Sequence, residues 1–310
     1  MAAPKILGLA GFGLEVPDLE SARRFYTAFG LDARDQDAGV SLRSPGRGHD
    51  EIVIVNGPAK RLRHLSFFIA PEAKTAFADK LQAAGLAVHE TPPIAGAAAG
   101  LWFQDPWGMW IHLDPRRPEP VPVAAVPIPN AGGRRDRVDV ALWQELDRKP
   151  VPRRIGHMLM FTQEWERVEA FYCEVLGFRT TDRAQGRVAF MAAGEGVIDH
   201  HCFGLINGTH RGIQHASFEV AGIDDIGFTA WRMREAGYKD GFGPGRHAIA
   251  SNLFHYTRDP WGSWIECYAD MDMVSDAWQC RDWQSLPYIW GPEWSPEFWT
   301  HEHNANFEPR

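Results

Sequence analysis

Two stretches of the chain, DPWGMWIH at residues 105–112 and DPWGSWIE at residues 259–266, repeat one another. They differ at one internal position and at the last one, which is His112 in the first copy and Glu266 in the second. An echo of this length indicates a duplicated structural unit. It also places residues of different chemistry at equivalent positions, and that difference is where a function can be sought.

The repeat continues on the N-terminal side of both stretches. The pair Phe25-Tyr26 matches Phe171-Tyr172, and residues 62–67 match residues 213–218, so the copies are offset by 146, 151 and finally 154 residues. Counting back fifteen residues from each tyrosine leads to position 11 and position 157. The second half therefore carries His157, His215 and Glu266 where the first half carries Gly11, His64 and His112.

Both halves predict the same order of elements: a strand, a helix and further strands. Asp18 and Thr162 are expected to cap the first helix of each half, and the Asp-Pro-Trp-Gly phrase is typical of a hairpin turn. The predicted strands are 7–16, 40–42, 51–55, 64–69, 101–103 and 110–113, then 155–162, 188–192, 215–220, 253–257 and 264–268. The predicted helices are 19–29, 72–84, 164–176 and 224–236.

The composition is that of an ordinary globular protein. A length of 310 residues suggests two domains, and 45% apolar residues are enough for real cores. The formal net charge of −8 argues against nucleic acid or an anionic membrane as the main partner. No apolar run is long enough to span a bilayer, and the N-terminus lacks the layout of a secretory signal. The four cysteines have no zinc-type spacing, so we expect reduced thiols and a cytoplasmic location.

The boundaries follow from the same pattern. We expect an N-terminal domain at 1–114, a proline-rich linker at 115–152, a C-terminal domain at 153–270 and a tryptophan-rich tail at 271–310. The tail has no match in the first half and contains five tryptophans, which favours an ordered segment because disordered tails are poor in aromatic residues. It could shield the mouth of a site or lie at a subunit interface, with plain packing as the default.

The three differing positions predict a metal site in the second half. Two histidines and one carboxylate, His157, His215 and Glu266, are the ligand set of the facial triad that holds non-haem Fe(II) and leaves positions open for substrate and O₂. The first half cannot build this set because Gly11 offers no donor. The alternative is that the histidines are buried core residues and that Glu266 lies at a rim.

With these residues the sequence resembles the type I extradiol ring-cleavage dioxygenases of the vicinal oxygen chelate superfamily, over about residues 5–290. The resemblance implies an α+β fold of two tandem domains, each of paired βαβββ modules like glyoxalase and bleomycin-resistance proteins, with the metal in the C-terminal domain. The family signature matches His247, Tyr256, the turn at 259–262 and Glu266. His247 is expected on a glycine-rich loop. His255 departs from the pattern, and on a strand it should face away from Tyr256.

The resemblance implies Fe(II), with Mn(II) as an alternative metal, and O₂-dependent extradiol (meta) cleavage of a catechol to a 2-hydroxymuconic semialdehyde-type product. His247 and Tyr256 would hydrogen-bond the bound oxygens. His201 would be the acid–base residue and is preferred over the neighbouring His200.

Several alternatives stay open. Another metal-dependent isomerase or lyase of the superfamily, or a non-catalytic binder of aromatic ligands, would fit the same fold. The resemblance implies a catechol substrate but leaves a monocyclic and a bicyclic one as alternatives, and homo-oligomers are expected because family members commonly form them.

Overall fold

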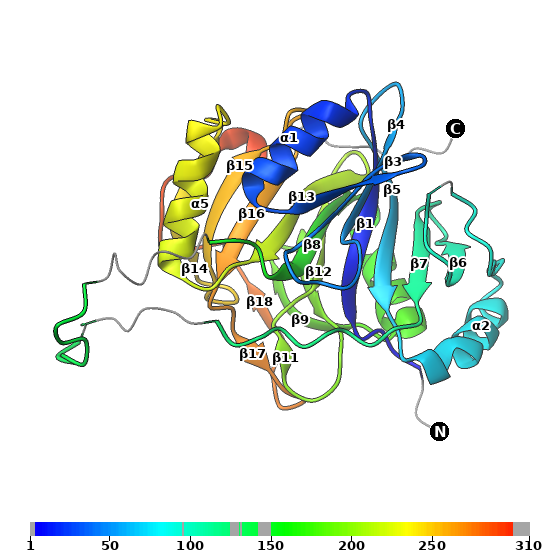
Figure 1. Cartoon of the computed structure of the whole chain (residues 1–310). Coiled ribbons are helices and arrows are strands. Elements are labelled where there is room, and N and C mark those ends of the chain that lie inside the picture. The colour runs from blue at the N-terminus through cyan, green and yellow to red at the C-terminus, as the bar shows by residue number, and fades with distance from the viewer. Residues whose placement is uncertain (1–3, 95, 125–129, 131, 142–149, 300–310) are drawn as a thin grey trace.

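The computed structural model describes residues 4–94, 96–124, 130, 132–141 and 150–299. Parts of the predicted linker and residues 300–310 of the predicted tail lie outside these described residues. Two mixed sheets, one from each half of the chain, lie side by side, with the helices packed around them (Figure 1). No helix in the described ranges combines the length and the apolar character needed to cross a membrane.

The first sheet has seven strands in the order β2-β3-β4-β1-β5-β7-β6. One half of the sheet consists of β1 and the three strands that follow α1, which are β2, β3 and β4. The other half consists of β5, β6 and β7. The elements are β1 (Gly8–Val16), α1 (Leu19–Phe29), β2 (Asp32–Gln36), β3 (Gly39–Arg43), β4 (Ile52–Asn56), β5 (Arg61–Phe68), the 3₁₀ helix η1 (Pro71–Ala73), α2 (Lys74–Ala83), β6 (Leu101–Gln104) and β7 (Trp110–Asp114).

The second sheet has ten strands in the order β18-β9-β10-β12-β8-β13-β16-β15-β14-β19. The elements are β8 (Arg154–Thr162), α4 (Trp165–Phe171), the π-helical η2 (Tyr172–Leu176), β9 (Arg179–Ala184), β10 (Val188–Ala192), β11 (Ile198–Asp199), β12 (Phe203–Asn207), β13 (Gly212–Glu219), α5 (Ile223–Glu235), β14 (Gly241–His247), β15 (Leu253–Arg258) and β16 (Trp264–Ala269). The C-terminal segment adds β17 (Met273–Val274), β18 (Arg281–Trp283), β19 (Tyr288–Trp290) and the 3₁₀ helix η3 (Pro296–Phe298). Strands β11 and β17 pair with each other in a separate two-stranded sheet.

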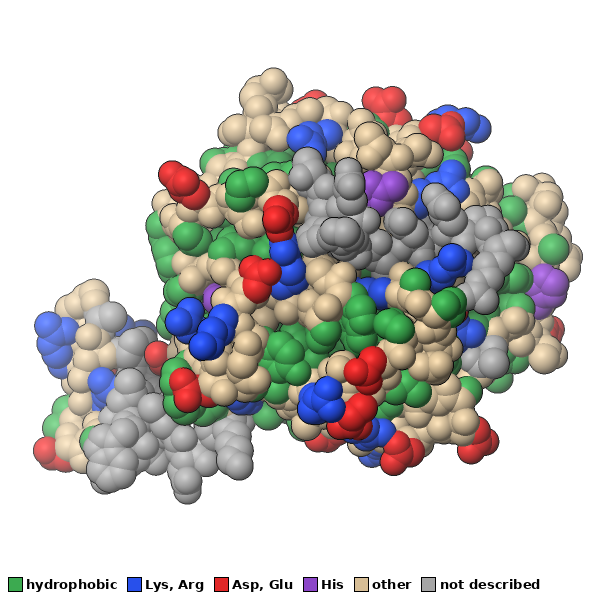
Figure 2. All heavy atoms as spheres, turned by 90° about the horizontal axis from the view of Figure 1, so that it is seen from above, with side chains coloured by type: hydrophobic (Ala, Val, Ile, Leu, Met, Phe, Trp, Pro, Cys, Tyr) green, Lys and Arg blue, Asp and Glu red, His purple; other side chains and the backbone are tan. Residues whose placement is uncertain are grey.

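The predicted α+β architecture of paired βαβββ modules is confirmed. Three modules are complete, and the fourth, in the second part of the first domain, is one strand short. There the described residues between α2 and β6 form only an isolated bridge, between His89 and Trp102. On the face shown in Figure 2, Lys and Arg side chains lie among Asp and Glu side chains, with hydrophobic side chains between them.

Most predicted elements are found within a few residues of their expected bounds. Asp18 caps α1 as expected, because its side chain accepts a hydrogen bond from Ser21 N. The predicted Thr162 cap is wrong: its hydroxyl donates to Gln163 O, and α4 begins after Glu164, which has a left-handed φ of 52°. The loop predicted around His247 is also wrong, since this glycine-rich segment pairs with β15 as strand β14.

The two halves have matching strand registers. In the first sheet Ser66 on β5 lies opposite Gly11 on β1 and His112 on β7. In the second sheet Ser217 on β13 lies opposite His157 on β8 and Glu266 on β16. The sequence alignment of the two copies is therefore also a spatial alignment, residue for residue, at the centre of each sheet.

The twin turns that end the repeat each contact the opposite domain. Lys60 of the first domain donates to the Asp259 carboxylate in the second turn, at 2.5 Å. In return, Arg211 donates to the Trp107 carbonyl in the first turn, and Tyr172 donates to Asp105 at 3.3 Å. Lys60 and Arg211 are equivalent in the repeat, so the domains are joined by an approximately two-fold exchange of contacts.

Candidate metal centre

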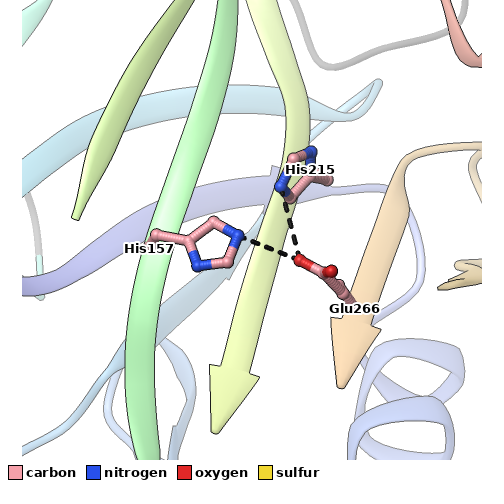
Figure 3. A group of neighbouring side chains, drawn as sticks. All are labelled: His157, His215 and Glu266. Atoms are coloured by element: carbon pink, nitrogen blue, oxygen red, sulfur yellow. Dashed lines mark ion pairs between the residues drawn. The ribbon is translucent and has the colours of Figure 1, made fainter. Parts of the chain in front are cut away.

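Three neighbouring strands of the second sheet bring the predicted ligands together. His157 on β8, His215 on β13 and Glu266 on β16 are all buried and point toward one another (Figure 3). His157 Nε2 lies 2.9 Å and His215 Nε2 lies 3.6 Å from Glu266 Oε2. Their ligand atoms all lie within 4.8 Å of one another, and within the described ranges no other three His, Cys, Asp or Glu residues do so.

This arrangement fits a divalent cation. Two ligand atoms held about 2.1 Å from one ion at right-angled or tetrahedral geometry would lie about 3.0–3.4 Å apart. The buried His215 Nε2 has no hydrogen-bond partner among the described residues. Glu266 is fully buried, yet no Lys or Arg in the described part of the chain forms an ion pair with it. A bound cation would satisfy both groups, since a buried carboxylate needs a compensating charge.

Two pKa values at this centre favour the ligand-competent protonation states. Burial, together with the neighbouring His157, lowers the pKa of His215 to about 3 despite the opposing charge of Glu266. Burial pushes the pKa of Glu266 upward, but hydrogen bonds from His157 and His247 outweigh it and hold that pKa below its ordinary value. The site therefore presents a neutral imidazole and an ionised carboxylate at neutral pH, as metal binding requires.

The first domain blocks its equivalent site with backbone. A Cβ atom added at Gly11 would lie 2.2 Å from the carbonyl oxygen of Glu51, so no side chain fits where His157 stands in the second domain. His112 instead hydrogen-bonds Ser66 at 3.1 Å and the Ala99 carbonyl at 3.2 Å. The Glu51 carboxylate accepts a hydrogen bond from Ile155 N at 2.7 Å, which ties the first domain to β8 just before His157.

Three polar residues that the sequence reasoning missed support the ligands. Ser217 Oγ donates to Glu266 Oε2 at 2.6 Å, and Asn252 Nδ2 lies 3.5 Å from Glu266 Oε1. Gln214 Oε1 accepts a hydrogen bond from His215 Nδ1. The first copy also has a serine, Ser66, at the position of Ser217. A search for residues that differ between the two copies therefore does not find Ser217.

His247 and Tyr256 lie beside the carboxylate ligand. The Tyr256 hydroxyl and His247 Nε2 are 3.2 Å apart, and His247 Nε2 lies 3.8 Å from Glu266 Oε1. Burial and the Glu266 charge raise the pKa of Tyr256 well above its ordinary value, so the phenol keeps its proton. His255 does not line the pocket that contains Tyr256, which agrees with its expected outward direction.

His201 lines the pocket, whereas His200 lies behind it. The ring centroid of His201 is 4.5 Å from that of His157. His200 is fully buried and connects two groups, with Nε2 at 3.2 Å from Asp182 Oδ2 and Nδ1 at 3.1 Å from His201 Nδ1.

This hydrogen-bond chain determines which ring nitrogens carry protons. Burial raises the pKa of Asp182, but hydrogen bonds from His200 and from Arg281 N outweigh it, so the pKa is lowered and the carboxylate only accepts. With His200 Nε2–H donating to this carboxylate, His200 Nδ1 can accept from His201 Nδ1–H. His201 Nε2 keeps its lone pair. Burial is the main cause that lowers the pKa of His201 well below its ordinary value, and the neighbouring His157 adds to it.

The C-terminal segment forms one wall of the pocket. Five residues of this segment line the pocket, and we call them the aromatic cover: Leu286, Pro287, Trp294, Phe298 and Trp299. The second domain contributes further apolar lining, with Leu159, Val188, Phe190, Ile206 and Ile249, and Leu286 and Trp299 of the cover pack against this cluster. Trp290, in the same segment, does not line the pocket and is 45% exposed. An earlier part of the same segment shields the Asp182–His200 pair, because Trp278 packs on His200 and Trp283 donates to Asp182.

Comparisons with known proteins agree with this geometry. The Glyoxalase/Bleomycin resistance protein/Dioxygenase superfamily model matches residues 8–113 and 154–267, which are the two repeated halves. The chain is 35% identical over 309 residues to "Metapyrocatechase 2" of Cupriavidus necator, covering 95% of this chain and 91% of that protein. It is 25% identical to the "Manganese-dependent 2,3-dihydroxybiphenyl 1,2-dioxygenase" of Geobacillus genomosp. 3, covering 93% and 96%.

Among solved structures, the Mn(II)-bound glyoxalase from Novosphingobium aromaticivorans superimposes with a TM-score of 0.78 at 21% identity, covering 98% of this chain and 97% of that one. At this identity the likeness speaks for the fold alone. The family match covers both domains, and the similarity to the metapyrocatechase extends over nearly the whole chain. The chain therefore belongs to the Glyoxalase/Bleomycin resistance protein/Dioxygenase superfamily and, within it, is an extradiol ring-cleavage dioxygenase.

Proposed function

We propose that the protein cleaves a catechol ring by extradiol (meta) addition of O₂, using Fe(II) held by His157, His215 and Glu266, and releases a 2-hydroxymuconic semialdehyde-type product. The observation that carries this proposal is the buried triad, whose ligand atoms lie within 4.8 Å of one another at the base of an apolar pocket. The bound metal would supply a place where both catechol oxygens and O₂ meet and exchange electrons.

The chain's own residues would position the substrate and move its protons. Tyr256 keeps its phenol proton and can donate a hydrogen bond to a catechol oxygen, and His247 lies 3.2 Å from that hydroxyl to orient it. His201 Nε2, with its lone pair free, can accept a proton from a catechol hydroxyl and return it later. His200 and Asp182 would keep His201 in this tautomer.

The pocket lining supports a catechol whose ring substituent is uncharged. None of the described residues that line it is Lys or Arg, and apart from the four histidines, Glu266, Asn252 and Tyr256 its described lining is apolar. A carboxylate on the substrate would lose its hydration there without gaining a cationic partner. Burying an unpaired charge in this way costs on the order of several kcal/mol. The guanidinium of Arg187 lies on the Trp299 ring, 5.4 Å from the ring centroid, and is shared with the π face of that ring.

The same reasoning gives each segment a role. Residues 1–114 would act as a scaffold domain and residues 153–270 as the catalytic domain, with 115–152 as the connection and the segment from 271 onward supplying the aromatic cover. Mn(II) is the alternative metal, because the ligand set accepts both ions and a manganese-dependent relative exists. Assembly as a homo-oligomer stays a prediction.

The test is an anaerobically metal-loaded enzyme, with Fe(II) or Mn(II), screened by oxygen electrode against simple, alkyl, aryl and carboxylated catechols. We expect stoichiometric O₂ uptake and a yellow product with the uncharged substrates and little turnover of the carboxylated ones. Loaded protein that consumes no O₂ with any catechol would refute the dioxygenase proposal. Turnover without O₂ would then point to an isomerase or lyase, and stoichiometric binding without turnover to a ligand-binding protein.

A further inference from the structure

The side chain of Gln214 links the metal ligand His215 to the aromatic cover by two hydrogen bonds. Gln214 is fully buried, and its amide oxygen accepts a hydrogen bond from His215 Nδ1. Its amide nitrogen donates to the main-chain carbonyl of Phe298 in η3, at 3.1 Å, although the two residues are 84 positions apart in the chain. The Phe298 ring also lies against His215, with centroids 6.1 Å apart and planes at 28°.

We propose that Gln214 is a positioning residue that couples closure of the aromatic cover to metal binding. The inference rests on the proposed metal site at His157, His215 and Glu266. When the cover is seated, the Phe298 carbonyl fixes the orientation of the Gln214 amide. The amide oxygen then faces His215 and holds the ring with Nε2 directed at the metal position.

The two hydrogen bonds are chemically directional. A carbonyl oxygen can only accept, so the Gln214 group that faces Phe298 must be the NH₂. The group that faces His215 must then be the amide oxygen, and His215 must carry its proton on Nδ1. The lone pair consequently lies on Nε2, which is buried and lacks a partner among the described residues. Such a bond to the second nitrogen of a ligand histidine fixes its tautomer and ring orientation.

The connection works in both directions by thermodynamic linkage. If a seated cover stabilises the ligand-competent orientation of His215, then a metal bound to His215 must stabilise the seated cover by the same free energy. The cover itself is a thin element: η3 has three residues, and Trp294 and Trp299 are only partly buried. Its seating depends on the packing of the Trp294 and Phe298 rings and on the Gln214–Phe298 hydrogen bond, which links the cover to the orientation of His215.

The experiment compares two variants of Gln214 in the full-length protein. Gln214→Glu keeps an acceptor for His215 but replaces the donor to Phe298 with an oxygen that repels the carbonyl. Gln214→Met removes both hydrogen bonds at similar volume. Gln163→Glu serves as the matched control, because Gln163 makes a comparable amide bond to the Thr209 carbonyl at an exposed position. Metal affinity is measured by Mn(II) titration, and amide hydrogen exchange of residues 286–299 is followed with and without Mn(II).

In the parent protein and in Gln163→Glu we expect Mn(II) to slow exchange in residues 286–299. Gln214→Glu should bind Mn(II) within about threefold of the parent, but Mn(II) should no longer protect the cover. Gln214→Met should lose about 10–100-fold in metal affinity. Parent-like protection in Gln214→Glu, or parent-like affinity in Gln214→Met, would overturn the coupling. A parent protein that binds no Mn(II) or Fe(II) would instead refute the proposed metal site.

Discussion

Ser217 donates a 2.6 Å hydrogen bond from its hydroxyl to the carboxylate of Glu266, on the neighbouring strand of the same sheet. The pairing is a direct result of the duplication, because the equivalent Ser66 lies opposite His112 and hydrogen-bonds its ring. Two equivalent serines thus orient a ligand carboxylate in the second domain and a structural histidine in the first. This relationship supplies matched controls, since the first domain repeats the local structure without the metal site.

Ser217→Ala should weaken metal binding without unfolding the protein. The substitution leaves Glu266 ionised but free to rotate, and loss of an outer hydrogen bond of this kind typically costs 10–100-fold in metal affinity. Competition with a chelator measures the change. Ser66→Ala in the first domain should leave the affinity unchanged, and an equal loss in both variants would mean that the effect is one of general stability.

Glu266→Ala should abolish metal retention and O₂ uptake while leaving the fold intact. The remaining two imidazoles make a weak site, and the fully buried carboxylate has no described Lys or Arg whose charge would be stranded. Metal content after dialysis and circular dichroism test both halves of the prediction. His112→Ala is the equivalent change in the first domain and should retain metal. Metal held in normal amount by Glu266→Ala would place the site elsewhere.

Substitution of the two adjacent histidines should affect catalysis unequally. His201→Gln removes the proposed proton acceptor and should lower kcat by about 10²–10⁴-fold, with KM changed far less. His200→Gln should give a smaller loss, since it leaves the His201 ring in place and disturbs only its tautomer. Steady-state O₂ uptake separates the two parameters. Equal losses in both variants, or a larger loss for His200→Gln, would reverse the assignment.

Lys60→Met should destabilise the interface between the domains. Lys60 is nearly fully buried against Asp259, so its removal leaves an uncompensated buried carboxylate, which typically costs about 3–5 kcal/mol. Denaturant unfolding measures the loss. The double variant Lys60→Met with Asp259→Asn should recover part of it, because the stranded charge is gone. If the double variant is no more stable than the single one, charge is not the cause.

Asp105→Asn should change how stability depends on pH. Burial raises the pKa of Asp105 from 3.8 to about 6, against the opposing hydrogen bonds from Met109 N and Trp107 N. A raised folded-state pKa contributes stability that is present below pH ~4 and lost as pH rises through ~6. Relative to Asp105→Asn, the parent's free energy of unfolding should therefore fall over this window, by up to ~3 kcal/mol. A constant difference from pH 4 to 7 would contradict the assignment.

Several elements of this protein could be predicted because their signals are local in the sequence. The Asp18 cap and the Asp-Pro-Trp-Gly turn depend on residues within four positions of each other, and both are found as expected. The glycines around His247 predicted a loop, but pairing with β15 and β19 made that segment a strand. Likewise Thr162 had the right side chain for a cap, and the backbone turned so that it faces Gln163 instead.

The sequence by itself determined the duplication, the order of strands and helices in each half and the identity of the three candidate ligands, since these follow from which residue types recur and where they differ. The paired-module fold was implied by the resemblance to a known family. Only the tertiary structure decided what holds the ligands in place. Gln214 meets Phe298 across 84 residues, Asp182 meets His200 across 18, and Ser217 meets Glu266 across 49. Hydrogen bonds depend on distance and direction in space, and these follow from strand order and register, which no single stretch of the chain encodes.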